Sequence, residues 1–363
     1  MRAALVTGTG LIGTSVALAL RRRGVEVHLT DRDPVAVRRA AELGAGSPDP
    51  PTEQVDVAVV AVSPSTTAEV VAGLIAGNSA ATVVDTASVK AGILREVVDA
   101  VGPAPHFVGT HPMAGRERSG PGAARADLFE GRPWVLTPAA ADPRSLGRAR
   151  RLVELCGGVA VEMGAEAHDA AVALVSHVPH VAASLVAARL AAGEEQDAAL
   201  SLTGQGLRDV TRVAASDPDL WVDVLTANAE PVARILSELG DEVVAVVAAL
   251  RQVVGDEHDG PARARLREVL VRGNAGRARL PGKHGGRSTT YAVVPVVVAD
   301  RPGELARLVN DVGAAGVNIE DLRIEHSPGQ PVGLVELAVT PEAETNVTQA
   351  LTGLGWVVHA EEA

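Results

Sequence analysis

The sequence predicts an α/β domain, followed by an all-α segment and a small α+β module. Strand-length and helix-length stretches alternate in the first half of the chain. Between Glu166 and Gly273 apolar residues recur at three- and four-residue spacing, which is typical of helices. Alternating strands and helices then return. Because 363 residues exceed one compact core, we place three domains at 1–165, 166–285 and 288–363.

The first domain is predicted from short β-rich runs bounded by turn residues. These runs are Ala3–Val6, Val25–Leu29, Val55–Val62, Thr82–Val84 and Phe107–Gly109. Helix-length stretches separate them, such as Pro34–Leu43, which has proline at a favourable first position. Apolar strands joined by helices indicate a parallel sheet covered on both faces. A further strand at Trp134–Thr137 and a tail ending near Met163 complete this domain.

The middle segment is predicted to be helical over Ala170–Ala192, Val222–Leu239 and Val243–Val254. Helices this apolar often pack against a second subunit, so we expect a homodimer. The basic, glycine-rich stretch Arg272–Arg287 is interpreted as a linker to the last module.

Composition excludes several classes of function. A net charge of −12 argues against a nucleic-acid or acidic-membrane partner, because either needs a basic face. The single cysteine, Cys156, excludes an internal disulfide and fits a reducing cytosol. We find no apolar run of the roughly 18 residues that span a bilayer and no secretory leader in Met1–Gly13. The sequence therefore predicts a cytoplasmic protein.

A glycine pattern follows the first predicted strand and begins the first predicted helix. It reads Gly8-Thr9-Gly10-Leu11-Ile12-Gly13. The first glycine permits a tight turn, the second lets the backbone approach a pyrophosphate, and the third lets helix and strand pack closely. The helix N-terminus favours the anion. This arrangement predicts a Rossmann domain that binds a dinucleotide.

Asp31, at the end of the second predicted strand, indicates which dinucleotide is bound. Its carboxylate can accept a hydrogen bond from the adenosine ribose 2′-hydroxyl and would repel a 2′-phosphate. We therefore predict NAD as the cofactor. The neighbouring Arg32 keeps NADP open, because an arginine can bind that phosphate.

Three polar residues follow successive strands of the predicted sheet: Ser63, Ser88 and His111. Ligands of open parallel sheets bind just past the carboxyl ends of strands, so these residues should gather near the nicotinamide. His111 is a candidate general base because imidazole titrates near neutral pH. A structural histidine is the alternative.

Further motifs accompany these residues in a fixed order. They are Asp85-Thr86-Ala87-Ser88-Val89-Lys90, Gly109-Thr110-His111-Pro112-Met113-Ala114-Gly115, Ser176-His177-Val178-Pro179-His180, Asp209-Val210-Thr211-Arg212, Ser216-Asp217-Pro218 and Trp221. Together they resemble the prephenate and arogenate dehydrogenase family. Gln205-Gly206-Leu207 departs from that family's glycine-rich, Phe-containing run beside the substrate pocket, which leaves the substrate open.

The resemblance implies oxidation of a cyclohexadienol ring with loss of carbon dioxide. In that family's terms, His111 accepts the hydroxyl proton, and Ser88 hydrogen-bonds the histidine and the substrate or cofactor. Arg212 binds a substrate carboxylate, for which guanidinium is suited. His180 and Ser176 contact the side-chain end of the substrate.

Each of these residues also has a less specific interpretation. Arg212 and Arg208 could form a solvated helix face, and Trp221 could belong to the core. His177 and His180 could suggest a metal pair, but no carboxylate or cysteine stands at ligand spacing, so we predict no metal. Glu117 could bias the charge of the pocket or lie at the surface.

The last module resembles an ACT domain, the βαββαβ fold that binds amino acids. The resemblance rests on Asp300-Arg301-Pro302-Gly303-Glu304-Leu305 and Gly316-Val317-Asn318-Ile319. It implies a ligand site formed by Asp300, Pro302, Gly303 and Asn318, usually across a pair of domains. We expect tyrosine as the effector; a purely dimerising module is the alternative.

The sequence thus predicts a feedback-regulated, NAD-dependent enzyme of tyrosine biosynthesis that acts on prephenate or arogenate. One alternative is a dehydrogenase for an amino-substituted prephenate in a secondary pathway. The other is a non-catalytic sensor of NAD and an amino acid. Ser88, His111 and Arg212 argue against the sensor, because binding NAD requires none of them.

Overall fold

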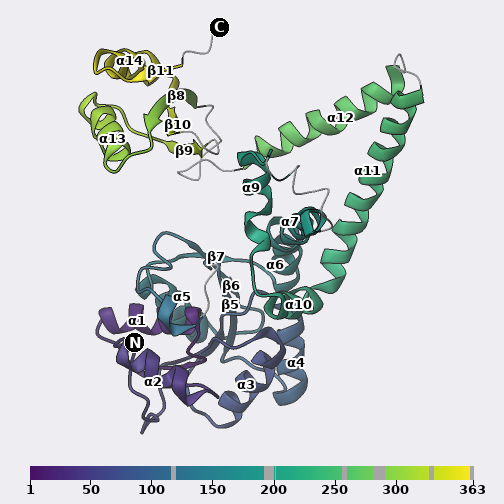
Figure 1. The fold of residues 1–363 in the computed structure, drawn as a ribbon. Coiled ribbons are helices and arrows are strands. Elements are labelled where there is room, and N and C mark those ends of the chain that lie inside the picture. The colour runs from purple at the N-terminus through teal and green to yellow at the C-terminus, as the bar shows by residue number, and fades with distance from the viewer. Residues whose placement is uncertain are drawn as a thin grey trace. The chain divides into compact units, whose positions relative to one another are not determined.

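A computed structural model describes residues 1–115, 120–191, 200, 202–255, 260–280, 291–326 and 331–359. The chain divides into two compact units, Met1–Asp241 and Glu242–Ala363. Figure 1 shows the elements of each unit.

The first unit is built on a sheet of seven strands. They are β1 (Ala3–Thr7), β2 (Glu26–Thr30), β3 (Val57–Val60), β4 (Val83–Asp85), β5 (Phe107–Pro112), β6 (Pro133–Thr137) and β7 (Val159–Glu162). Their spatial order is β2-β1-β3-β4-β5-β6-β7. The chain thus moves outward from β1 in both directions, which creates the crevice where Rossmann folds bind nucleotides. The predicted Rossmann domain is confirmed.

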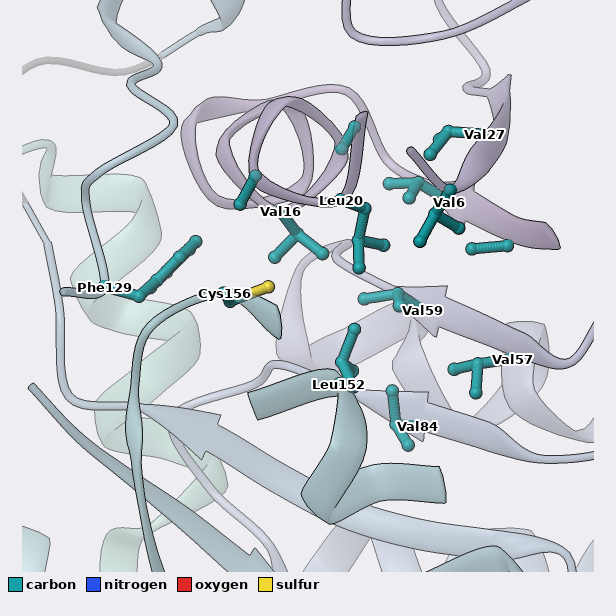
Figure 2. Packing of buried hydrophobic residues seen from close by; sticks show 14 of the residues in the cluster. Val6, Val16, Leu20, Val27, Val57, Val59, Val84, Phe129, Leu152 and Cys156 are labelled. Atoms are coloured by element: carbon teal, nitrogen blue, oxygen red, sulfur yellow. The ribbon is translucent and has the colours of Figure 1, made fainter. Parts of the chain in front are cut away.

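Helices cover both faces of this sheet. They are α1 (Leu11–Arg22), α2 (Pro34–Glu42), α3 (Pro64–Ala76), α4 (Ala91–Val101) and α5 (Pro143–Leu155). Side chains from α1, α2 and α5 form one buried cluster with the sheet, and those from α3 and α4 form a second. Figure 2 shows Leu20 of α1 and Leu152 of α5 directed toward Val59 and Val84 of the strands. Aliphatic side chains therefore make up most of this core, with Phe129 and Trp134 as buried aromatic residues.

The sheet is not wholly parallel, which corrects the prediction. β6 pairs antiparallel with β5, and β7 pairs parallel with β6. In the described part of the connection from β5 to β6, the only helical element is the 3₁₀ turn η1 (Pro121–Ala123). For β6 to run parallel to β5, the connection would need a crossover that brings the chain back to the end of the sheet where β5 begins. Without one, β6 runs back beside β5.

The helical segment of this unit begins with one continuous helical stretch. It contains α6 (Ala165–Val172), the π-helical turn η2 (Ala173–His177), α7 (Val178–Ala188) and the 3₁₀ turn η3 (Arg189–Ala191). The helix predicted at Ala170–Ala192 thus starts earlier, and its last residue lies outside the described residues. Single π turns inside α-helices occur frequently at functional sites.

The remaining helical elements are α9 (Gln205–Thr211), η4 (Arg212–Ala214), α10 (Pro218–Ala227) and α11 (Ala229–Gly255). The sequence predicts two helices here, at Val222–Leu239 and Val243–Val254, but the position of the break between them was predicted wrongly. The break lies at Asn228, which is buried, and α11 then continues without interruption.

In the part of the chain that the structure describes, one helix is long and apolar enough, by length and composition alone, to cross a membrane. Ala165–Ala191 contains an 18-residue window of mean hydropathy 1.7, contrary to the expectation that no such run exists. His168, Asp169 and His177 lie buried in this stretch. Its polar residues thus form part of the protein interior, as the site below shows.

The second unit contains the end of α11, α12 (Gly260–Arg277) and a small α+β module. Because α12 extends to Arg277, the first residues of the predicted linker Arg272–Arg287 are helical; arginine and alanine are good helix formers. The module comprises β8 (Ala292–Ala299), α13 (Glu304–Ala314), β9 (Asp321–His326), β10 (Val332–Val339), α14 (Pro341–Gly353) and β11 (Val357–Val358). Its antiparallel sheet has the order β11-β8-β10-β9, which is the predicted βαββαβ arrangement.

Candidate active site

The three glycines after β1 differ in what surrounds them and in their backbone conformation. Gly8 has a φ of +97°, and a Cβ there would lie 2.3 Å from the Ala61 carbonyl oxygen. A Cβ on Gly13 would lie 1.9 Å from the Gly8 carbonyl oxygen. A Cβ on Gly10, the N-cap of α1, would meet nothing within 4 Å. The turn is therefore closed by Gly8 and Gly13 and open at Gly10, where a pyrophosphate can approach.

Leu11 and Ile12 begin helix α1 and are partly buried against the core. Their amides belong to the first turn of the helix, where backbone N–H groups have no partner within the helix. This orphan group of donors is what an anion binds at a helix N-terminus.

Asp31 follows β2 and faces this turn. Its carboxylate accepts hydrogen bonds from the Thr9 amide at 2.6 Å, the Thr9 hydroxyl at 3.0 Å and the Asp33 amide at 3.0 Å. Burial raises its pKa, but these hydrogen bonds outweigh burial and lower the pKa below its usual value. The carboxylate is thus anionic and held in place beside the glycine turn. Arg32 is exposed. These residues fit NAD, which supplies a hydride acceptor when bound.

The three polar residues expected past the strands lie at the same edge of the sheet. Ser63 is the N-cap of α3, directly after β3, and its hydroxyl lies 3.1 Å from the Thr66 hydroxyl. Ser88 follows β4 and is half-buried. His111 is the next-to-last residue of strand β5, beside Pro112. Since β3, β4 and β5 are parallel neighbours, the fold brings these residues to one edge.

His111 is held from behind by two residues of α6. Its Nδ1 lies 2.9 Å from Nε2 of His168, and the two rings meet edge to face. Nδ1 of His168 in turn lies 2.8 Å from Oδ1 of Asp169. The partner of His111 Nδ1 in the described structure is thus His168. The hydrogen bond expected between Ser88 and this ring stays a prediction.

Asp169 also fastens α6 to the start of α4. Its Oδ1 accepts from the Lys90 amide and its Oδ2 from the Ala91 amide, both at 2.8 Å. Burial raises the pKa of Asp169, but the hydrogen bonds from His168 and from the two amides lower it below its usual value. A carboxylate that accepts so many donors is anionic at neutral pH.

A buried ion pair lies beneath the same edge. The Lys90 ammonium donates to Oδ2 of Asp85 and, at 2.7 Å, to the carbonyl oxygen of Thr110. Oδ1 of Asp85 accepts from the Thr110 amide at 3.0 Å. Both charged side chains are almost fully buried. This pair ties β4, β5 and the start of α4 together directly before His111.

His111 is electrically neutral at neutral pH. Burial lowers its pKa well below the usual range, and the neighbouring His168, Lys90 and His177 lower it further. A neutral imidazole keeps one nitrogen able to accept a proton, which is the requirement for a general base.

His177 and Asn228 extend the hydrogen-bond network around Asp169 to the break between helices α10 and α11. The Asn228 side-chain amide donates to the Asp169 carbonyl oxygen at 2.9 Å and to Nδ1 of His177 at 3.1 Å. Burial lowers the pKa of His177 to about 4, so this histidine is neutral and accepts the bond.

His180 stacks on Trp221 of α10, with ring centroids 3.5 Å apart and planes inclined by 6°. Burial lowers the pKa of His180 as well. Trp221 is half-buried, so it is partly a surface of this site and not a residue of the core alone. Within the described residues no group of three or more histidine, cysteine or acidic side chains could hold a metal ion.

Ser176 and Arg212 complete the predicted set. Ser176 is half-buried in the π turn η2, next to His177. Arg212 begins η4, which packs against α7, the helix that carries His180. Its side chain is exposed. The elements of His180 and Arg212 are thus neighbours. Glu117 lies outside the described residues.

His168, Asp169, Lys90 and Asn228 were not singled out as site residues from the sequence. Their proximity to His111 depends on α6 packing beside the start of α4, which no local pattern encodes. A signal was nevertheless present. Polar residues in an apolar helix are buried only when they are hydrogen-bonded, so a histidine and an aspartate within Ala165–Val172 indicated internal partners.

The residues predicted to bind an effector lie at both ends of α13. Asp300, Pro302 and Gly303 form the exposed loop after β8, and Gly303 has a φ of +93° at the N-cap of the helix. Asn318 follows α13, where its side-chain amide donates to Glu320 at 2.6 Å.

A Rossmann crevice with an anionic Asp31, and a neutral histidine at the carboxyl edge of the strands, define a nucleotide-dependent dehydrogenase. Comparison with known families identifies which one. Residues 16–162 match the family described as "Prephenate dehydrogenase, nucleotide-binding domain", and residues 164–268 match "Prephenate dehydrogenase, dimerization domain". The chain belongs to the prephenate dehydrogenase family and is an NAD-dependent oxidoreductase.

Individual relatives agree with this assignment. The chain is 44% identical to "Probable prephenate dehydrogenase NovF" of Streptomyces niveus, over 98% of this chain and 99% of that one. It is 32% identical to the cyclohexadienyl dehydrogenase of Zymomonas mobilis, over 69% and 88%. The crystal structure of prephenate dehydrogenase from A. aeolicus, in complex with hydroxyphenyl propionate and NAD⁺, superposes with a TM-score of 0.63 at 29% identity. That match covers 75% of this chain and 97% of the other.

Proposed function

We propose that the chain oxidatively decarboxylates prephenate to 4-hydroxyphenylpyruvate, or arogenate to tyrosine, in tyrosine biosynthesis. The observation that carries this proposal is the neutral, half-buried His111 at the carboxyl ends of the strands, in a sheet whose crevice fits NAD. The relatives support it, since the two given above are named as a probable prephenate dehydrogenase and a cyclohexadienyl dehydrogenase.

In the proposed reaction, Nε2 of His111 takes the proton of the substrate hydroxyl while the carbon that bears it loses a hydride. The ring carboxylate leaves as carbon dioxide, and its electron pair completes the aromatic ring. The phenolate oxygen then recovers the proton, because a phenol with a pKa of about 10 holds it more tightly than an imidazole does. With bound NAD⁺ as the acceptor of the hydride, atoms and charge balance without any other reactant.

The substrate must also be held by its carboxylates. We assign the ring carboxylate to Arg212, whose guanidinium can form a bidentate pair, and the side-chain end to His180 and Ser176. Ser88 is assigned to the substrate or cofactor, and Ser63 and Gly8–Gly13 to NAD. The neutral state of His180 favours a hydrogen-bonding role over a charge-pairing one.

The substitution His111→Asn tests the base. Asparagine is polar and of similar reach but accepts no proton at neutral pH, so we expect kcat to fall by about 10²- to 10⁴-fold with KM nearly unchanged. NADH production should be followed with prephenate, arogenate and an amino-substituted prephenate. A near-normal kcat in this variant would make His111 structural. Failure of all three substrates in the unaltered chain would refute the assigned reaction.

We further propose that the chain works as a cytoplasmic homodimer, with domains 1–165 for NAD, 166–285 for substrate and dimerisation and 288–363 for regulation. The family description of residues 164–268 supports the dimer. So do exposed apolar side chains on the helices, which would be covered in a dimer: Leu174, Val175, Leu185, Val222 and Leu250.

The last module is proposed to be an ACT domain that binds tyrosine at Asp300, Pro302, Gly303 and Asn318. The two parts of this site lie at opposite ends of α13, an 11-residue helix. At about 1.5 Å per residue, they are roughly 16 Å apart in one copy. An amino acid cannot contact both ends at once, so the site needs the loop of one module and the Asn318 region of another.

A further inference from the structure

The direction of each hydrogen bond behind His111 follows from the Asp169 carboxylate. Two backbone amides at the start of α4, those of Lys90 and Ala91, donate to it. The N-terminus of that 11-residue helix also favours a negative charge. An ionised carboxylate only accepts hydrogen bonds. Nδ1 of His168, 2.8 Å from Oδ1 of Asp169, must therefore carry a proton and donate it.

This first donor determines the next bond. If His168 carries a single proton and that proton is on Nδ1, its Nε2 is bare. That nitrogen can only accept, and Nδ1 of His111 at 2.9 Å must be the donor. A neutral His111 then has its lone pair on Nε2. If His168 turned the other way, the His111 proton would move to Nε2 and the base would be lost.

We propose that His168 and Asp169 are positioning residues that hold the proton of neutral His111 on Nδ1 and so leave Nε2 free for the substrate hydroxyl. The inference rests on the proposed role of His111 as general base. When His111 gains a proton on Nε2, the positive charge lies one histidine away from the Asp169 carboxylate. The same pair that selects the tautomer thus also stabilises the imidazolium.

Three substitutions separate this role from a structural one. Asp169→Asn can donate its amide proton to His168 Nδ1, which would reverse both histidines, so we expect kcat to fall by about 10³- to 10⁴-fold. His168→Leu removes the acceptor of His111 and should lower kcat by about 10²- to 10³-fold. His168→Gln can accept from His111 and donate to Asp169. It should therefore recover most of the activity that His168→Leu loses.

The matched control is His106→Gln. His106 also contacts a carboxylate through Nδ1, at 3.0 Å from Asp142, but lies at the surface away from this network. We expect its kcat to equal that of the unaltered enzyme. In the His168 and Asp169 variants, KM and the Kd for NADH should change by less than about 3-fold, because neither residue is assigned to a ligand. Equal losses in His168→Gln and His168→Leu, or losses that appear in KM, would overturn the proposal.

Nitrogen NMR of the unaltered full-length enzyme supplies a readout that does not depend on a variant folding. With ¹⁵N-labelled histidine, the His111 signals are identified by their absence in His111→Asn. We expect a protonated Nδ1 and a bare Nε2 at neutral pH. A proton on Nε2 would refute the relay while leaving the role of His111 as base to be decided by the kinetics of His111→Asn. Loss of the base role itself would appear as near-normal kcat in that variant.

Discussion

At the scale of single residues, the cofactor site is defined by how Asp31 is held. Thr9 occupies the position between the first two glycines, is fully buried and donates to Asp31 through both its amide and its hydroxyl. The residue between the glycines thus orients the carboxylate that we propose selects the ribose. The carboxylate is preorganised before NAD binds, which reduces the entropy lost on binding.

The substitution Asp31→Asn tests this selection. It removes the charge that favours a ribose hydroxyl and repels a 2′-phosphate. A hydrogen bond to a charged group contributes about 1.5–3 kcal/mol, so the KM for NAD should rise by about 10- to 150-fold while NADP turnover improves. Steady-state kinetics with both cofactors measure the change. Asp33→Asn is the control, because asparagine caps α2 as well as aspartate does. An unaltered preference for NAD in Asp31→Asn would shift the assignment to other residues.

The buried histidines make the stability of the fold depend on pH. The pKa of His177 is about 4 in the folded chain and about 6.5 in an unfolded one. Between these values the unfolded chain binds the extra proton, so the free energy of unfolding decreases as the pH falls from 6.5 toward 4. The lowered pKa of His111 acts in the same direction.

Thermal unfolding at several pH values between 7 and 4 checks this expectation. Tm should fall as the pH is lowered from about 6.5 toward 4. His177→Gln keeps an acceptor for Asn228 but does not titrate, so its Tm should fall less steeply. His106→Gln removes a surface histidine and serves as the matched control. A variant His177→Gln with the same slope as the unaltered chain would contradict the assigned cause.

At the scale of elements, the strands were predictable because each carries its own signal. β1, β3 and β4 are short apolar runs that are buried on both faces, and such runs are visible without tertiary information. The direction of β6 was not, because it depends on the path of a connection with no crossover helix. The break at Asn228 was missed for a related reason. Its cause is a pair of tertiary hydrogen bonds, to Asp169 and His177, and the apolar periodicity continues on both sides of it.

The candidate site divides in the same way. Gly8, Gly13 and Asp31 were predictable because a backbone turn and a strand end require those residue types locally. His111 was predictable because it lies near the end of a strand, although that strand, β5, continues to Pro112 and not only to the expected Gly109. The contacts proposed to position its proton come from α6, and His168 lies 57 residues later in the chain than His111. Sequence spacing alone cannot predict such a contact.

The ion pair of Lys90 and Asp85 connects β4, β5 and α4. Its removal should therefore lower the stability of all three elements. Lys90→Met fills a similar volume but leaves the Asp85 charge buried without its partner. Breaking a buried pair in this way lowers the free energy of unfolding by about 3–5 kcal/mol. Urea unfolding measures it. The double substitution Lys90→Met with Asp85→Asn should recover part of the loss, since no charge then remains buried.

The matched control for Lys90→Met lies at the surface. Arg150 and Glu162 form an ion pair at 2.5 Å with both side chains substantially exposed. Solvent screens such a pair, so Arg150→Met should leave the unfolding midpoint nearly unchanged. If Lys90→Met were as mild as Arg150→Met, the buried pair would have no special part in holding these elements.

At the scale of the whole molecule, catalysis and regulation are assigned to separate parts of the chain. Residues 16–162 and 164–268 match the two domains of the prephenate dehydrogenase family, and the βαββαβ module follows them. The module has its own buried core, made by β8, β10, α13 and α14. An independent core allows a module to bind a ligand without contributing to the active site, so that any effect on turnover requires different affinity for two states of the enzyme.

Removal of this module tests the regulatory proposal. Tyrosine should inhibit the full-length chain, whereas a chain that ends at Gly286 should remain active and lose the response. Calorimetry should detect tyrosine binding to the full-length chain alone, and phenylalanine and tryptophan should be titrated beside it. Asn318→Ala in the full-length chain should weaken binding without altering kcat, since Asn318 lies in the module. Inhibition that persists in the shortened chain would mean that tyrosine competes at the active site, as a product-like ligand could.

Because the two halves of the proposed effector site lie at opposite ends of α13, tyrosine binding should also require paired modules and weaken when the dimer is diluted into monomers.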